Sequence, residues 1–380
     1  MSETADWLRA RVDAMVELTR ELVAAESPSD DANALAAAVD LLVERAEPLL
    51  AVTPTRLGTA NAPALTWSLP AVRSESRPVV LLAHLDTVWA TGTLARWPFT
   101  VEADRATGPG AFDMKAGLVQ GLFALAALAV ADEDRPPVVL VVTTDEEIGS
   151  PVGRQIVEDA ARDAAAVLVL EPSVDGRLKV ARKGVSNYDL HLVGRSAHAG
   201  LEPELGVNAL VAAAGLTLAV VDLAAPELGT TVTPTLASAG TTRNTVPAAA
   251  TVALDVRAST VGEQQRVDAA LRALQPELGA TLTVDGGPNR PPMEEQSAAP
   301  LVPLAQRAAA CCGLPPLETA AVGGGSDGNF TAALGVPTLD GLGAVGAGAH
   351  AEGEYVVVSA MPDRAALVAE LVVEIGRSLS

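Results

Sequence analysis

Two kinds of hydrophobic pattern divide the chain. Towards both ends, short runs of consecutive apolar residues alternate with longer stretches of helical length and spacing. The apolar runs span residues 79–83, 137–143 and 166–170; the helical stretches span residues 115–130, 151–161 and 361–379. Continuous apolar runs suit strands that are buried on both faces. The alternation predicts an α/β fold, with a mixed, mostly parallel sheet and helices on both faces.

The middle of the chain has a clearer alternation of apolar and polar positions. It predicts strands at 188–193, 251–257 and 281–284 and helices at 205–223 and 262–274. The order strand, helix, strand, strand, helix, strand predicts an inserted α+β domain of ferredoxin-like type. Residues 286–292 are rich in Gly and Pro and are expected to form the return linker. We therefore expect one domain from residues 1–177 and 289–380, interrupted by a second domain at 178–288.

Composition and charge narrow the class of protein. The 380 residues carry 47 acidic and 26 basic side chains, a net charge of −21, which argues against a nucleic-acid or anionic-membrane partner. The longest apolar stretch, 117–131, is shorter than the roughly 20 residues that span a bilayer, and we expect it to be a buried helix. The N-terminus lacks the pattern of a signal peptide. The only cysteines, Cys311 and Cys312, are adjacent and poorly placed for a disulfide. A cytoplasmic globular protein is expected.

Acidic and histidine residues follow each of the three apolar runs. The ends of these predicted strands should meet at one edge of the sheet, where ligands bind in open α/β folds. Two further candidates lie in glycine-rich loops. Together the candidate ligands are His84, Asp113, Glu147, Glu171 and His350.

This set of imidazoles and carboxylates suits zinc, with cobalt or manganese as substitutes. One catalytic ion needs about three protein ligands, so five ligands can serve two ions if a carboxylate bridges them. Two ions can hold and acidify a shared water. Asp86, two residues after His84, can orient that imidazole. The neighbours Glu146 and Glu147 can divide the roles of ligand and general base, and the sequence does not assign them.

Other chemistries have weaker support. Ser326 lies in a G-x-S-x-G string, and Asp340 and His350 follow in the order of a serine hydrolase; however, the strand expected before it is poor, and the acidic residues would have no role. The string GLGAVG at 341–346 is not followed by a helix, as a dinucleotide site requires. A metal-binding protein without catalytic activity is a third alternative.

A series of strings spread over residues 78–358 resembles one family. The strings are HLDTV, GPGAFDMKAG, TDEEIGS, EPS, RSAHAG, GVNAL, RNTVP, DVRA, RPPM, GGGSDG and GAHAEGEYV. They look like the co-catalytic zinc aminoacylase, carboxypeptidase and acetylornithine deacetylase superfamily, and in particular its bacterial glutamate carboxypeptidase branch. The resemblance implies a di-zinc enzyme that hydrolyses an amide or peptide bond beside a free carboxylate. A glutamate-type carboxypeptidase is favoured, and an N-acyl-amino-acid deacylase is the alternative.

The resemblance also implies roles for the candidate ligands. His84, Asp113 and Glu171 would bind one zinc ion, Glu147 and His350 would complete the site of the second, and Asp113 would bridge the two. Glu146 would be the general base. The family often has a cis peptide bond after the bridging aspartate.

The insert resembles the dimerisation domain of the family, so a homodimer is expected. By the same resemblance His198 would stabilise the oxyanion, commonly from the partner subunit, with Asn244 near it. Three basic residues would bind the free carboxylate of a small peptide or N-acyl amino acid; they are Lys179, Arg257 and Arg290. Asp255 is an alternative, structural partner for Arg257, and His191 is expected to be structural.

Overall fold

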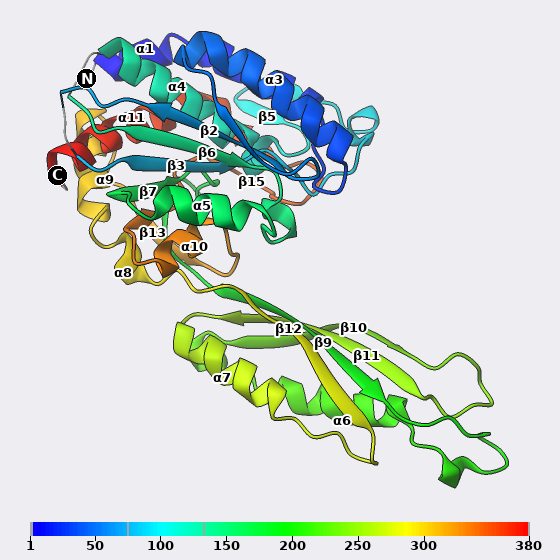
Figure 1. Cartoon of the computed structure of the whole chain (residues 1–380). Coiled ribbons are helices and arrows are strands. Elements are labelled where there is room, and N and C mark those ends of the chain that lie inside the picture. The colour runs from blue at the N-terminus through cyan, green and yellow to red at the C-terminus, as the bar shows by residue number, and fades with distance from the viewer. Residues whose placement is uncertain (1–2, 74–75, 132–133, 379–380) are drawn as a thin grey trace. The chain divides into compact units, whose positions relative to one another are not determined.

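The chain divides into two compact units in a computed structural model that describes residues 3–73, 76–131 and 134–378 (Figure 1). The large unit comprises Met1–Ala181, Glu294–Val322 and Ser326–Ser380. The small unit comprises Arg182–Met293 and Gly323–Gly325. The divisions at 182 and 293 lie a few residues later than those expected at 178 and 288.

A six-stranded sheet forms the centre of the large unit, in the order β1-β2-β6-β3-β7-β14. Its members are β1 (Thr55–Gly58), β2 (Pro63–Leu69), β3 (Val79–His84), β6 (Val138–Thr143), β7 (Ala166–Val169) and β14 (Thr338–Leu339). Strands β6, β3, β7 and β14 pair in parallel, and β1 and β2 pair antiparallel. The predicted mixed, mostly parallel α/β fold is confirmed, and the three apolar runs form its buried central strands.

Helices cover both faces of this sheet (Figure 1). On one face Val80 and Leu82 of β3 pack with α5 (Gly153–Ala161), next to α10 (Gly328–Ala333). On the other face lies α4 (Ala116–Ala131), buried along most of its length. The helices packed on α4 are α1 (Glu3–Arg9), α2 (Val12–Ala24), α3 (Ala32–Leu50) and α11 (Met361–Ser378). Of these four helices, only α11 was expected from the sequence pattern. The predicted helix, 361–379, included residue 379, which lies outside the described residues.

The apolar segment Ala111–Ala131 is long and apolar enough to cross a membrane by length and composition alone. However, 83% of its most apolar window is buried inside the protein. Other helices and the sheet surround α4, so its apolar surface is buried in the core of the large unit. The expectation of a buried helix is confirmed.

Smaller elements complete the large unit. Helices α8 (Glu295–Ala298) and α9 (Val302–Cys311) follow the insert, and α9 packs on α11. Strand β13 (Thr319–Val322) pairs with β8 (Leu178–Arg182). A second small sheet contains β4 (Thr100–Glu102), β5 (Arg105–Thr107), β15 (Gly346–Ala347) and β16 (Tyr355–Val357). These short strands connect the glycine-rich loops that carry Asp113 and His350.

The small unit is an antiparallel sheet in the order β10-β11-β9-β12 with two helices. Its elements in chain order are β9 (Gly184–Val193), α6 (Ala209–Val221), β10 (Thr231–Ala239), β11 (Ala249–Ala258), α7 (Val261–Arg272) and β12 (Thr281–Arg290). Both helices pack on the sheet through one apolar core. This is the predicted ferredoxin-like order of elements.

The expectation of a linker at residues 286–292 is wrong for most of that segment, because β12 continues to Arg290. Gly286 has φ 87° and lies so close to the carbonyl oxygen of Asn187 on β9 that a Cβ atom would clash with it. Glycine here therefore permits close strand pairing.

Replacing Gly117 by Ala tests how tightly α4 packs on the sheet. A Cβ atom at this position would clash with the carbonyl oxygen of Leu170, which is backbone and cannot rotate away. We expect Gly117→Ala to lower the free energy of unfolding by about 1–3 kcal/mol. Urea unfolding followed by tryptophan fluorescence measures this, because all four tryptophans lie in the large unit.

The matched control is Gly121→Ala, one turn further along α4. A Cβ atom there would meet only Cδ1 of Leu170, at the end of a side chain that can change rotamer. The control should therefore be the milder variant. Equal unfolding midpoints for the two variants would contradict the backbone contact as the cause.

Candidate metal centre

The carboxyl ends of the central parallel strands bring three groups of side chains together. His84 is the last residue of β3, the residues after β6 form an acidic turn, and Glu171 follows β7. We call residues 145–150, which include Glu146 and Glu147, the acid turn. The Nε2 atom of His84 lies 3.5 Å from Oε1 of Glu171 and 3.5 Å from Oδ1 of Asp113.

Asp113 lies between the two imidazoles. Its Oδ1 atom faces His84, and its Oδ2 atom lies 3.4 Å from Nε2 of His350. The same His350 atom is 3.1 Å from Oε2 of Glu147. The structure thus brings the five candidate ligands into one cluster, with the Asp113 carboxylate between the two imidazoles.

Several polar atoms of this cluster are buried without a hydrogen bond to any described residue. They are Nε2 of His84, Oδ1 of Asp113 and Oε1 of Glu147. Donor atoms of two sets of three residues lie within 4.8 Å of one another; the sets are His84, Glu146 and Glu171, and His84, Asp113 and Glu147. Buried, converging donor atoms of this kind fit divalent metal ions of the zinc class.

The pKa shifts of the two histidines show that the carboxylates of the cluster stabilise positive charge. Hydrogen bonds to Asp113 and Glu147 raise the pKa of His350 to about 10. Burial opposes the charged form of His84, but Asp113, Asp86 and Glu171 raise its pKa well above the usual value. Burial also acts against ionised Asp113, yet the two imidazoles hold its pKa low. The carboxylates therefore favour any cation that the cluster can take up.

Asp86 connects His84 to the acid turn. Its side chain is fully buried; its backbone carbonyl oxygen lies 3.0 Å from Nδ1 of His84, and its Oδ1 atom lies 3.4 Å from the same nitrogen. The backbone N–H groups of Glu146 and Glu147 donate to the same carboxylate at 3.3 and 3.1 Å. Ser29 donates to it at 2.7 Å. Asp86 therefore orients the imidazole and also fixes the backbone of both acids.

Three residues around the cluster were not found by the sequence analysis. Ser29 comes from the N-terminal region, for which no element was predicted. Lys115 is buried, donates to the carbonyl of Leu22 at 2.8 Å, and has its pKa lowered to about 7 by burial. Burial raises the pKa of Glu354 to about 8. Lys115 and Glu354 lie within the strings GPGAFDMKAG and GAHAEGEYV, so the same family resemblance could have pointed to them.

The peptide bond between Asp113 and Met114 is cis, as the resemblance implies. The left-handed backbone of His350, with φ 62°, is also uncommon for a residue with a side chain.

His198 and Asn244 lie side by side in the small unit, because the N–H of Ala199 donates to the carbonyl of Asn244 at 2.9 Å. The N–H of Gly200 donates to Nδ1 of His198 at 3.1 Å. A neutral His198 ring that accepts at Nδ1 carries its proton on Nε2. This side chain is exposed and can donate from Nε2.

The expected carboxylate-binding residues have different surroundings. Arg257 makes a bidentate ion pair with Asp255, the alternative that the sequence left open, with its shortest N···O distance 2.7 Å. Arg290 is 7% exposed. Lys179 belongs to the large unit, with Nζ 3.9 Å from Oε2 of the candidate ligand Glu171.

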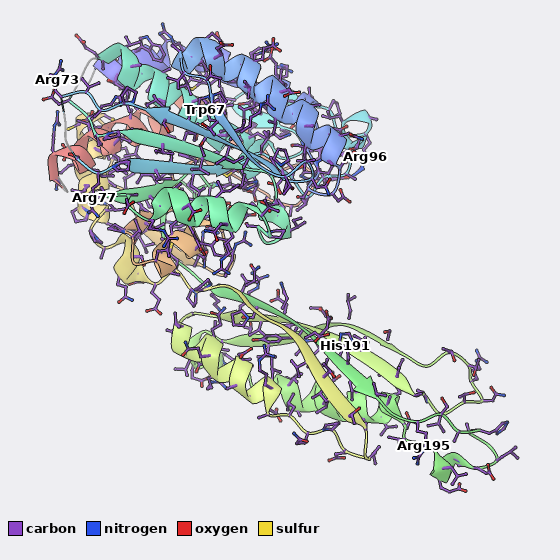
Figure 2. All side chains as sticks on the ribbon, viewed as in Figure 1. Trp67, Arg73, Arg77, Arg96, His191 and Arg195 are labelled. Atoms are coloured by element: carbon purple, nitrogen blue, oxygen red, sulfur yellow. The ribbon has the colours of Figure 1, made fainter. Side chains whose placement is uncertain are left out.

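Two further sequence interpretations concern residues outside the cluster. His191, on the sheet of the small unit (Figure 2), lies 3.3 Å from both Thr251 and Asp285, which fits a structural role. Ser326 is fully buried and donates to Asp340 at 2.7 Å. A nucleophilic serine must be exposed beside an imidazole, so the serine hydrolase alternative is not supported.

Comparison with known proteins identifies relatives over most of the chain. The family model of peptidase family M20/M25/M40 matches residues 80–374. Carboxypeptidase G2 from Pseudomonas sp. (strain RS-16) is 32% identical over 381 residues, which cover 96% of this chain and 89% of that protein. Succinyl-diaminopimelate desuccinylase from Dechloromonas aromatica (strain RCB) is 28% identical over 387 residues, covering 93% and 97%.

Solved structures share the fold. A tripeptidase from Staphylococcus aureus subsp. aureus mu50 superposes with a TM-score of 0.78, with 20% sequence identity and coverage of 97% of this chain and 99% of that chain.

Proposed function

This chain belongs to peptidase family M20/M25/M40 and is therefore a metallohydrolase. We propose that it is a di-zinc enzyme that hydrolyses an amide or peptide bond beside a free carboxylate. The observation that carries this proposal is the position of Asp113 between His84 and His350, with one carboxylate oxygen towards each imidazole. The proposal favours a glutamate-type carboxypeptidase.

The residues divide into two metal sites that share one carboxylate. We assign His84, Asp113 and Glu171 to one zinc ion, and Asp113, Glu147 and His350 to the other. When bound, two such ions acidify a shared water and stabilise negative charge on the reacting carbonyl oxygen.

The remaining residues position groups or move protons. Glu146 is buried, belongs to the same cluster as His84 and Glu171, and is assigned as the base that takes a proton from the attacking water and returns it to the leaving amine. Asp86 keeps Nε2 of His84 pointing into the cluster. His198 is assigned to donate its Nε2 proton to the substrate carbonyl oxygen, with Asn244 beside it.

Two relatives support two related substrate classes. The identity to carboxypeptidase G2 favours release of a C-terminal amino acid such as glutamate, and the likeness to succinyl-diaminopimelate desuccinylase keeps N-acyl amino acids as the alternative. Lys179, Arg290 and Arg257 are assigned to the free carboxylate. Arg257 also pairs with Asp255, and Nζ of Lys179 lies 3.9 Å from Oε2 of Glu171.

The Glu146→Gln variant tests the reaction. Glutamine keeps the shape of the side chain but cannot accept a proton, so turnover of N-acyl glutamates and short peptides should fall by several orders of magnitude. Bound zinc, measured by elemental analysis, should remain at two ions per chain. Near-normal turnover by this variant, or activity of the native enzyme that survives complete chelation, would contradict the mechanism.

We also propose that the chain forms a homodimer through α6 and β10. Helix α6 is apolar on both sides: one side packs in the core of the small unit, while its other side exposes large apolar residues. These are Leu210 50%, Val211 53%, Leu218 74% and Val221 47%. The neighbouring β10 is an edge strand and exposes 73% of Leu236. An apolar patch beside an open strand edge suits a second copy of the same surface.

We propose a cytoplasmic location, because Cys311 is an exposed free thiol and such thiols persist in a reducing compartment.

Replacing Leu218 by Asp tests the dimer. A charge in the centre of an apolar interface would have to be buried without a partner, so the variant should sediment as a monomer at concentrations where the native protein is a dimer. Leu278→Asp is the control, because Leu278 is 56% exposed in the turn between α7 and β12. A native protein that is monomeric, or a Leu218→Asp variant as dimeric as the control, would contradict the interface.

A further inference from the structure

The GGGSDG string at residues 323–328 has no role in the proposed reaction, yet Asp327 within it accepts hydrogen bonds from residues on either side of Glu146 and Glu147 in the sequence. Its Oδ1 atom accepts a hydrogen bond from Ser150, the last residue of the turn. Its Oδ2 atom accepts one from Thr143, the last residue of β6, at 3.2 Å. The side chain is 3% exposed. One buried carboxylate thus joins the two residues that flank Glu146 and Glu147 in the sequence.

The acid turn needs such support because its backbone is tightly folded. The N–H of Gly149 donates to the carbonyl of Glu146 at 2.9 Å, and the N–H of Ser150 donates to the carbonyl of Asp145 at 2.8 Å. Ser150 has φ 58°, in the left-handed region that residues with a side chain seldom occupy. The hydrogen bond from its hydroxyl to Asp327 favours this conformation over the alternatives.

Asp327 is itself held by a buried network. Ser326, the residue before it, donates to Asp340 at 2.7 Å, and the N–H of Ser326 donates to Asn329 at 2.9 Å. The carbonyl of Asp327 accepts the N–H of Phe330 in α10 at 3.1 Å. The Ser326 hydroxyl that resembles a nucleophile therefore stabilises the loop that presents Asp327.

We propose that Asp327 is a positioning residue for the acid turn, which sets the places of Glu146 and Glu147 without touching the substrate. Asp86 accepts the N–H groups of the two acids, while Asp327 accepts hydroxyl groups from Thr143, which precedes the turn, and from Ser150, at its end. Removal of Asp327 loosens Glu147 as a ligand and Glu146 as a base together. This inference rests on the proposed function of the site.

The test compares two pairs of variants by cobalt titration, the cobalt absorption spectrum, and kcat and KM. Asp327→Asn keeps the shape but replaces one accepting oxygen by an amide donor. Thr143→Val removes the hydroxyl at nearly constant volume, whereas Thr143→Ser keeps it. Glu374→Gln, on α11, is the control for loss of a carboxylate, because Glu374 pairs with Arg307 and is not part of the acid turn network.

We expect Asp327→Asn and Thr143→Val to weaken cobalt binding at least about tenfold, to change the cobalt spectrum, and to lower kcat more than they raise KM. Thr143→Ser and Glu374→Gln should resemble the native protein in all four readouts. If Asp327→Asn does not fold, the two Thr143 variants decide: a lower cobalt affinity in Thr143→Val alone supports the inference.

A folded Asp327→Asn with native cobalt affinity, spectrum and kcat would overturn the inference, as would Thr143 variants that do not differ from each other. These outcomes leave the proposed function intact. Failure of the native protein to bind cobalt would overturn both the inference and the proposed function.

Discussion

Buried negative charge is the constraint on which the architecture of the large unit depends. Asp86, Asp113, Glu147 and Glu171 lie within or against one cluster and are largely shielded from solvent. An isolated carboxylate removed from water costs several kcal/mol, and neighbouring carboxylates also repel one another. The imidazoles with raised pKa and the nearby Lys115 and Lys179 offset only part of this charge. Divalent cations bound by the proposed ligands would offset the rest of the charge.

Segments that are far apart in the sequence each contribute side chains to this cluster. His84, the acid turn and Glu171 lie at the carboxyl ends of parallel strands, at one edge of the central sheet. Asp113 and His350 come from glycine-rich loops. Two carboxylates then hold the acid turn: Asp86 accepts two of its N–H groups, and Asp327 accepts the hydroxyl groups of Thr143 and Ser150. Hydrogen bonds that fix the supporting residues keep ligands in place before any cation arrives.

Much of this arrangement could be predicted from the sequence because it follows from the order of strands. An apolar run followed by His or Glu places such side chains near the sheet edge, so His84, Glu171 and the unassigned pair Glu146 and Glu147 could be predicted there without knowledge of the fold. The position of a loop residue cannot be predicted from strand order in this way. The family resemblance was therefore needed to assign Asp113 as the central carboxylate. The proposed role of Asp327 was not predicted because its string resembles a nucleophile elbow, and the burial of Ser326 adds to the sequence arguments against that elbow. Residues 286–292 resembled a linker because Gly and Pro are frequent in linkers, although Gly286 is required for strand pairing.

The most direct test of the account is anomalous X-ray diffraction at the zinc edge from crystals of the zinc-loaded protein. The account predicts two peaks per chain, one beside His84 and Glu171 and the other beside Glu147 and His350, with Asp113 contacting both and Glu146 bound to neither. A single peak in this cluster, or a structure in which Glu146 rather than Asp113 connects the ions, would contradict it.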